Sequence, residues 1–124
     1  EPKMVGNSGQ GQLKVIPIVG GTFYGDGIQG TVVAGGADWN TTFENGSVHV
    51  FAKYMLKTND GEFIAIENEG LMDKSTETMI KTKPTFQTNT AGKYRYLNYG
   101  VYVGELSPTP NGEPSVDIVI YKLR

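Results

Sequence analysis

Residues 19–39 read VGGTFYGDGIQGTVVAGGADW, and this stretch decides how the fold is interpreted. Seven of its twenty-one residues are glycine, and it ends in Asp38 and Trp39, the only tryptophan of the chain. Glycine at this density lets a backbone approach a ligand closely, or it lets β-strands bend sharply. The spacing G-x-G-x-x-G occurs at residues 25–30, but the residues that follow are strand-like. A dinucleotide fingerprint needs a helix there to receive the pyrophosphate, so strand curvature is the better interpretation.

A β-hairpin is the clearest local pattern outside this stretch. Residues 47–58 read SVHVFAKYMLKT, in which apolar residues occupy the even positions and several odd positions are polar or charged. This period of two is typical of a half-buried strand. Asn59-Asp60-Gly61 follows with residues that tolerate the positive φ of a hairpin turn. EFIAIEN at 62–68 is then predicted to return as the partner strand.

The remaining runs complete an all-β pattern. Further strands are predicted for LKVIPIV at 13–19, IQGTVVA at 28–34, IKTKPTFQT at 80–88, KYRYLNYGVYVGEL at 93–106 and SVDIVIYKL at 115–123. Residues 1–12 are polar and predict a loop, and LMDKSTETM at 71–79 is the helical candidate, of about one to two turns. About seven strands joined largely by short turns predict one domain over residues 1–124. That domain is expected to be an all-β antiparallel barrel with at most one short helix, bent at its glycines.

Composition excludes several function classes. The 124 residues are 38% apolar and 19% charged with a net charge of -2, which is ordinary for a globular protein. No basic block or aromatic-basic stripe is present, so we expect no nucleic-acid partner. No apolar run has the length of a membrane span or a signal h-region, so we expect no membrane partner and a cytoplasmic location. Cysteine is absent and His49 is the only histidine, so neither a metal site nor a cofactor is predicted.

Several segments together resemble one known family. They are GGTFYGDGIQGTVVAGGADW at 20–39, YMLKTNDGEFI at 54–64, TKPTFQT at 82–88, YRYLN at 94–98 and VYVG at 101–104. In this order they resemble, over roughly residues 13–123, the family labelled domain of unknown function 3237, which consists of small bacterial and fungal proteins. The resemblance implies a calycin-like (lipocalin-type) antiparallel β-barrel and no established activity. It also implies a further strand ahead of the part that matches residue 1, so we expect such a strand to precede this chain.

The chain departs from this family at several polar positions. Family members tend to carry Asp and Arg where this chain has Phe51 and Lys53, Arg at Lys81, and Trp at Tyr96. Lysine lacks the bidentate fork of arginine, so the resemblance does not imply fixed carboxylate recognition here. Chemistry that relied on an Asp–Arg pair in relatives is either absent from this protein or performed differently.

Asp38 and Trp39 are the first candidate site residues. They follow Gly35-Gly36, which places both side chains at the predicted end of a strand. In a functional interpretation Trp39 walls a pocket at the barrel mouth, and Asp38 serves as a hydrogen-bond acceptor or a base. In a structural interpretation Trp39 plugs one end of the barrel and Asp38 caps a turn. The sequence leaves both interpretations open.

Lys53 and Lys81 are candidates because family members tend to carry Arg at these positions. If both point inward, they provide a cationic feature for an anionic or enolate oxygen. Lys53 shares a strand face with Met55, whereas Tyr54 and Leu56 share the other. The alternation therefore equally allows two solvated lysines on the outer face.

Tyr94, Tyr96 and Asn98 alternate along one predicted strand and complete the set of ligand-binding candidates. Together with Tyr102, beyond a bend at Gly100, they would line a pocket with flat walls and a few polar groups. The alternative is a set of cross-strand aromatic pairs without a binding role.

Two functions fit these residues. The first is a barrel that binds a small organic ligand. In an enzyme version it isomerises or cyclises a small carbonyl or aromatic compound, with Asp38 as the base and Lys53 or Lys81 as the oxyanion partner. The second is a structural or assembly protein whose barrel is filled by side chains; the sequence does not decide whether the protein is an enzyme. A homodimer is predicted through the exposed edge of the strand that contains Pro17.

Overall fold

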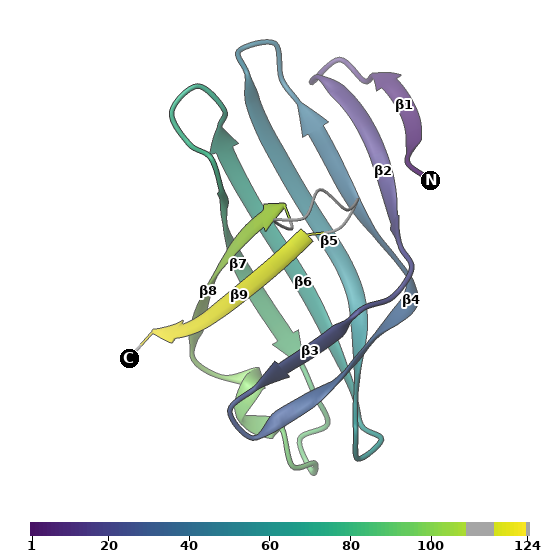
Figure 1. The fold of residues 1–124 in the computed structure, drawn as a ribbon, viewed down its shortest axis with the longest axis vertical. Coiled ribbons are helices and arrows are strands. Elements are labelled where there is room, and N and C mark those ends of the chain that lie inside the picture. Colours follow the sequence, from purple (N-terminus) through teal and green to yellow (C-terminus); the bar gives the residue numbers. More distant parts are fainter. Residues whose placement is uncertain (109–115, 124) are drawn as a thin grey trace.

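Nine β-strands and one 3-10 turn make up the described part of the chain, residues 1–108 and 116–123 of a computed structural model (Figure 1). The strands are β1 (Lys3–Asn7), β2 (Gln12–Ile18), β3 (Thr22–Gly25), β4 (Ile28–Thr42), β5 (Ser47–Thr58), β6 (Phe63–Asp73), β7 (Ile80–Gln87), β8 (Val101–Pro108) and β9 (Val116–Leu123). The 3-10 turn η1 (Arg95–Asn98) lies between β7 and β8. These described residues contain no helix of the length and apolarity needed to cross a membrane.

The strands form one antiparallel sheet that curls on itself. Its order is β1-β2-β4-β5-β6-β7-β8-β9, with β3 paired to the first part of β4. In Figure 1, β8 and β9 pass in front of β5–β7, and β3 crosses the same side lower down. Phe23 of β3 and Ile120 of β9 both pack on the buried cluster that contains Ile64 and Ile66. The predicted all-β, barrel-like architecture with at most one short helix is confirmed.

The buried core follows from the alternation in the sequence. Residues 47–57 of β5 pair with residues 63–73 of β6 without a register shift. On both strands the even-numbered side chains point inward, and Ile64 and Ile66 are 0% and 2% exposed. Burial of a side chain of this size stabilises the fold by roughly 1.5–3 kcal/mol. The predicted hairpin around the turn at 59–61 is therefore the centre of the observed sheet.

Gly35 and Gly36 let β4 bend within the part that pairs with β5. The pairing between these strands shifts between Val33 and Ala37. Gly35 lies in the left-handed region at φ +118, which side-chain-bearing residues rarely adopt. A Cβ at Gly36 would lie 2.5 Å from the Cβ of Tyr54, which is an overlap. These two glycines therefore serve curvature and close packing, as the sequence interpretation expects.

The amino-terminal residues 1–12 are not the loop that their composition predicts. Residues 3–7 form β1 and pair with residues 12–15 of β2. Their polar composition does not predict this hairpin, because an edge strand buries little of either face and therefore needs few apolar residues. Within the described strands, β2 beyond residue 15 pairs only with β4, so Pro17 lies on an open edge as expected. A homodimer through that edge stays a prediction.

Two further expectations from the sequence are corrected. Residues 71–79 do not form a helix, because β6 continues to Asp73 and a turn follows in which the Ser75 N–H donates to Asp73 Oδ1 at 3.0 Å. Residues 93–106 do not form one strand, because η1 interrupts them and β8 begins only after Gly100, at φ +88. In both places the hydrogen bonds of a short turn hold the observed structure.

β7 and β8 are joined over a short distance only. Residues 80–82 of β7 pair with residues 104–106 of β8, whereas β7 pairs with β6 as far as Gln87. Pro84 lies in β7 beyond the part that has a neighbour on both sides, where a missing N–H is tolerated. The sheet is therefore least continuous between these two strands.

Candidate functional site

Polar side chains occupy the inner face of the sheet at the level of Asp38. Asp38 lies opposite Ile16 of β2 and Ala52 of β5, and Ala52 lies opposite Asn68 of β6. Because directly paired residues share a face, Asp38 and Asn68 point to the same inner side, two strands or roughly 10 Å apart. The buried Ile66 lies on this face as well, so the polar level adjoins the apolar core.

Among the described residues, four inner polar atoms have no hydrogen-bond partner although solvent does not reach them. They are Asp38 Oδ1, Asn68 Oδ1, Thr82 Oγ1 and Tyr102 OH, one on each of β4, β6, β7 and β8. Asn68, Thr82 and Tyr102 are only 2%, 3% and 9% exposed. Burial of a polar group without a partner costs roughly 1–3 kcal/mol, and folded proteins satisfy nearly all such groups. We call these four residues the inner polar band.

The register brings members of the inner polar band close together. Thr82 lies opposite Gly70 of β6 and Gly104 of β8. Asn68 is two residues from Gly70, which makes it a diagonal neighbour of Thr82, roughly 7–8 Å away. Tyr102 is two residues from Gly104 and shares its face. The band therefore runs across β6, β7 and β8, and the two positions directly opposite Thr82 are glycines, which place no side chain between its members.

Aromatic rings adjoin the inner polar band. The ring of Tyr102 meets that of Phe86 edge-on, with centroids 5.2 Å apart, and burial raises the pKa of the Tyr102 hydroxyl, which stays a donor. Tyr54 lies on β5, two residues from the Ala52 that faces Asp38. Flat apolar walls with a few hydrogen-bonding atoms are the usual composition of small-molecule sites.

Burial also changes the proton chemistry of Asp38. It raises the pKa of this carboxyl above the ordinary value of 3.8, against smaller opposing effects of the Phe51 backbone amide, His49 and Lys14. The pKa of Tyr54 is raised as well, first by burial and then by the negative charge of Asp38. A carboxyl group with a raised pKa is a better proton acceptor, and Tyr54 beside it remains a proton donor. This pair has the elements of acid–base chemistry.

Trp39 lies on the opposite face of the sheet from Asp38. β4 does not end at the double glycine but runs on to Thr42, and successive strand residues alternate between faces. Trp39 is 50% exposed and pairs with Val15 and Phe51. The expectation that a strand end presents both side chains together is corrected, since only Asp38 belongs to the inner polar band.

Lys53 and Lys81 both lie on the outer face. The Lys53 side chain is 68% exposed, and its Nζ lies 3.5 Å from the Glu67 carboxylate. Lys81 is exposed and pairs in register with Glu105. Of the two orientations that the sequence left open, the structure has the outer one for both lysines. It therefore brings neither ammonium group together with Asp38.

Tyr94, Tyr96 and Asn98 do not share a strand face, because the chain turns at η1. Tyr94 is buried and its hydroxyl donates to Asp60 Oδ1 at 2.9 Å. Tyr96 is 43% exposed, with its ring centroid 6.5 Å from that of Tyr94. The Asn98 amide accepts from the Thr88 N–H at 2.7 Å and donates to the Thr88 carbonyl at 3.0 Å. Asn98 is thus a loop anchor, and Tyr94 belongs to the end of the sheet.

Asn68 and Thr82 are site residues that are not predicted from the sequence. A signal for Asn68 is present, because it is a polar residue in the same alternating series as Ile64 and Ile66. The position of Thr82 depends on the register between β6 and β7, which no local pattern contains.

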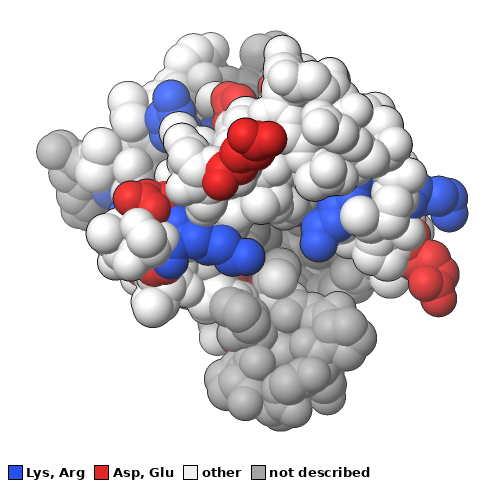
Figure 2. Space-filling view, turned by 90° about the horizontal axis from the view of Figure 1, so that it is seen from above, with Lys and Arg blue, Asp and Glu red and all other residues white. Residues whose placement is uncertain are grey.

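Two hollows in the described surface lie apart from Asp38 and Trp39. One of about 500 Å³ opens over β6, β7 and β8, and Lys81, Thr82 and Glu105 are among its lining residues. Another of about 380 Å³ lies at one end of the sheet, beside Tyr94. The face seen from above in Figure 2 intersperses acidic and basic side chains among uncharged ones, without an extended patch of one sign.

Comparisons with known proteins agree with this architecture. The family model described as "Protein of unknown function (DUF3237)" matches residues 1–123. A UPF0311 protein of Rhodopseudomonas palustris (strain TIE-1) is 31% identical over 114 residues, which cover 80% of this chain and 74% of that protein. A solved beta-barrel like protein from Acinetobacter baumannii AYE has a TM-score of 0.87 at 26% identity, covering 100% of this chain and 87% of the other. A protein with unknown function from Clostridium acetobutylicum ATCC 824 has a TM-score of 0.84 at 28% identity, covering 98% and 88%. The resemblance identified in the sequence is confirmed.

Proposed function

The chain belongs to the family described as protein of unknown function (DUF3237), and from its own residues we propose that it binds a small organic molecule inside its barrel-like sheet. The observation that carries this proposal is the inner polar band, where Asp38, Asn68, Thr82 and Tyr102 each keep a buried polar atom without a partner. A bound molecule that supplies those partners would remove the free-energy cost of leaving them unpaired. The free energy regained in this way would favour binding.

The free atoms of the inner polar band define the chemistry of the ligand. Asn68 Oδ1 can only accept a hydrogen bond, whereas the hydroxyls of Thr82 and Tyr102 can both donate and accept. The ligand therefore carries at least one hydrogen-bond donor together with carbonyl or hydroxyl oxygens. The neighbouring rings of Tyr102 and Phe86 favour a flat or ring-containing body. A small aromatic or carbonyl compound meets both requirements.

A second candidate function is acid–base catalysis on such a compound, favoured by the raised pKa of Asp38 beside Tyr54. Asp38 would take a proton from a carbon next to a carbonyl group and return it at another carbon, which isomerises the compound. The Tyr54 hydroxyl would donate a hydrogen bond to the developing enolate oxygen. This role replaces the one expected for Lys53 or Lys81, whose ammonium groups lie on the outer face.

The test is a thermal-shift screen of pooled small organic compounds, followed by calorimetric titration of each hit. A ligand of the folded chain raises its melting temperature. Thr82→Val removes the unpaired Oγ1 and keeps the side-chain shape, so it should weaken binding by roughly tenfold. Lys81→Met changes the adjacent residue on the outer face and should leave the affinity unchanged.

The two variants also separate the alternatives. If Lys81→Met weakens binding, the ligand occupies the hollow of about 500 Å³ that Lys81 lines, and the inner site is refuted. If no compound shifts the melting temperature of the wild type, the rival interpretation gains, in which the barrel is filled and serves structure or assembly.

A further inference from the structure

The hollow of about 380 Å³ at the end of the sheet is separate from the inner polar band and shares no lining residue with it. Three segments meet there: the β3–β4 hairpin with Gly25 and Gly27, the β5–β6 turn with Asp60, and the segment before η1 with Lys93 and Tyr94. The two glycines place no side chain in this space. Its volume lies in the range of small-molecule sites.

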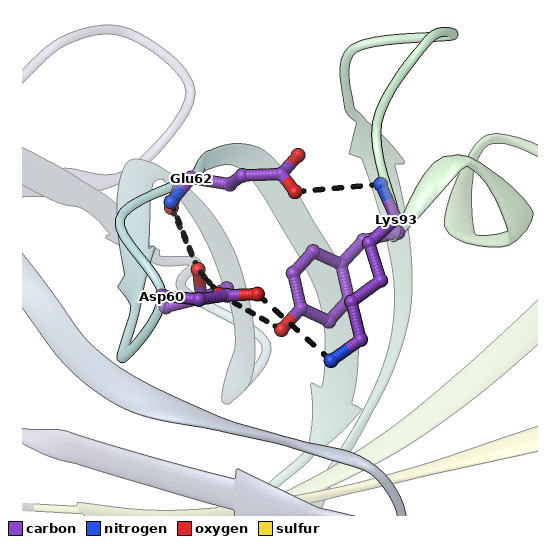
Figure 3. A network of polar contacts seen from close by, with 5 residues as sticks. Asp60, Glu62 and Lys93 are labelled. Atoms are coloured by element: carbon purple, nitrogen blue, oxygen red, sulfur yellow. Dashed lines mark hydrogen bonds and ion pairs between the residues drawn. The ribbon is translucent and has the colours of Figure 1, made fainter.

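Asp60 is held in this hollow as a fixed acceptor (Figure 3). Its Oδ1 accepts hydrogen bonds from the Thr58 hydroxyl and, at 2.9 Å, from the Tyr94 hydroxyl. Thr58 and Tyr94 are 2% and 4% exposed, so both donors are anchored in the core. These hydrogen bonds, that of Thr58 first, lower the pKa of the Asp60 carboxyl. Asp60 therefore presents a carboxylate of fixed orientation.

The opposite charge in the hollow is Lys93. Its backbone N–H donates to Glu62 Oε2 at 3.3 Å, and its Nζ lies 5.5 Å from the centroid of the Tyr94 ring. The same Nζ lies 3.9 Å from Asp60 Oδ2, with the lysine side chain 67% exposed (Figure 3). An exposed ion pair at this distance contributes little stability. Both charges can therefore exchange partners at little cost in free energy.

We propose that this hollow binds a small zwitterion, a free α-amino acid with an apolar side chain. Its ammonium group would meet Asp60 Oδ2, and its carboxylate would meet Lys93 Nζ. A simple amine would be repelled by Lys93 and a simple carboxylate by Asp60, so the paired charges select a ligand that carries both. Ile28 and the Tyr94 ring also line the hollow and would contact the apolar side chain. This site is independent of the function proposed for the inner polar band.

The experiment is a titration of the ¹⁵N-labelled chain with three matched probes, followed by amide chemical shifts. The probes are L-leucine, 3-methylbutylamine, which is leucine without its carboxylate, and 4-methylpentanoate, which is leucine without its ammonium group. L-Leucine is expected to shift the amides of residues 59–61 and 92–94 and to bind at least roughly tenfold more tightly than either single-charge probe, as one lost charge-assisted contact implies. Equal affinities for the three probes, or no saturating shift with L-leucine, would overturn the proposal.

Two variants and one control assign the charges. Lys93→Met should weaken L-leucine by roughly tenfold without weakening 3-methylbutylamine, and Asp60→Asn should weaken L-leucine without weakening 4-methylpentanoate. Lys57→Met is the control, since the Lys57 ammonium lies over the Phe63 ring at 5.6 Å in a similar exposed setting but outside the hollow. If Asp60→Asn disturbs the β5–β6 turn, the L-leucine affinity of Lys93→Met alone tests the site. An unchanged L-leucine affinity in Lys93→Met refutes the site.

Discussion

Tyr102→Phe tests whether the inner polar band is unsatisfied in the free protein. The substitution removes a single oxygen atom, the buried hydroxyl without a partner, and keeps the ring that meets Phe86 edge-on at 5.2 Å. Burial of an unpaired hydroxyl costs roughly 1–3 kcal/mol, so we expect the variant to unfold with a free energy about 1 kcal/mol higher than that of the wild type. In a chain of this length the gain corresponds to about 3–5 °C in melting temperature or about 0.5 M in the urea midpoint.

The assay is urea unfolding followed by far-UV circular dichroism, with equal m-values required for the comparison. Tyr94→Phe is the matched control, because it removes the same atom from a ring that is also buried, but one whose hydroxyl donates to Asp60. Its midpoint is expected to fall. If the midpoint of Tyr102→Phe falls too, that hydroxyl has a partner in the free protein, and the reasoning from unpaired atoms is refuted.

Two further predictions concern β4: one is the pH dependence of stability due to Asp38, and the other compares alanine substitutions at Gly36 and Gly27. Burial raises the folded-state pKa of Asp38 above its ordinary 3.8, so this carboxyl contributes stability below pH 3.8 that is lost as the pH rises through the raised value. Asp38→Asn should therefore gain in melting temperature relative to the wild type between about pH 4 and 7, and a constant difference across that range would contradict it. Gly36→Ala places a Cβ 2.5 Å from the Tyr54 Cβ and should lower the unfolding free energy by about 3 kcal/mol. Gly27→Ala, at φ +74 in open space, should lower it by only about 1 kcal/mol, and equal urea midpoints for the two variants would count against the packing argument.

Local patterns account for the parts of the fold that the sequence predicts. The β5–β6 hairpin is predictable because the alternation of residues 47–58 and the turn residues at 59–61 point to the same structure. The β1–β2 hairpin is not, since an edge strand needs no apolar face and residues 3–7 show none. The end of β7 and the start of β8 depend on hydrogen bonds between Asn98 of η1 and the backbone of Thr88, which neither local pattern contains.

The candidate site is predictable only in part, for a related reason. Between their paired residues β4 advances four positions, from Val33 to Ala37, while β5 advances two, from Met55 to Lys53. The alternation of β4 is therefore retained through the bend, which directs Asp38 inward although a double glycine suggests a strand end. Thr82 becomes a neighbour of Asn68 only through the pairing of two strands, and no property of either segment alone contains that register.

The short ladder between β7 and β8 is a place where the folded sheet can open at low cost in free energy. Separation there breaks main-chain hydrogen bonds along residues 80–82 only, whereas separation of β5 from β6 breaks them along the whole of residues 47–57. Folded proteins open locally in contiguous cooperative units, and regions held by few contacts open at low free energy. β8 and β9 pair with each other over their full length, so we expect them to separate from β7 together. Thr82 and Tyr102 lie on opposite sides of the ladder between β7 and β8, so we expect a ligand to reach the inner polar band through the wall of the barrel rather than through its ends.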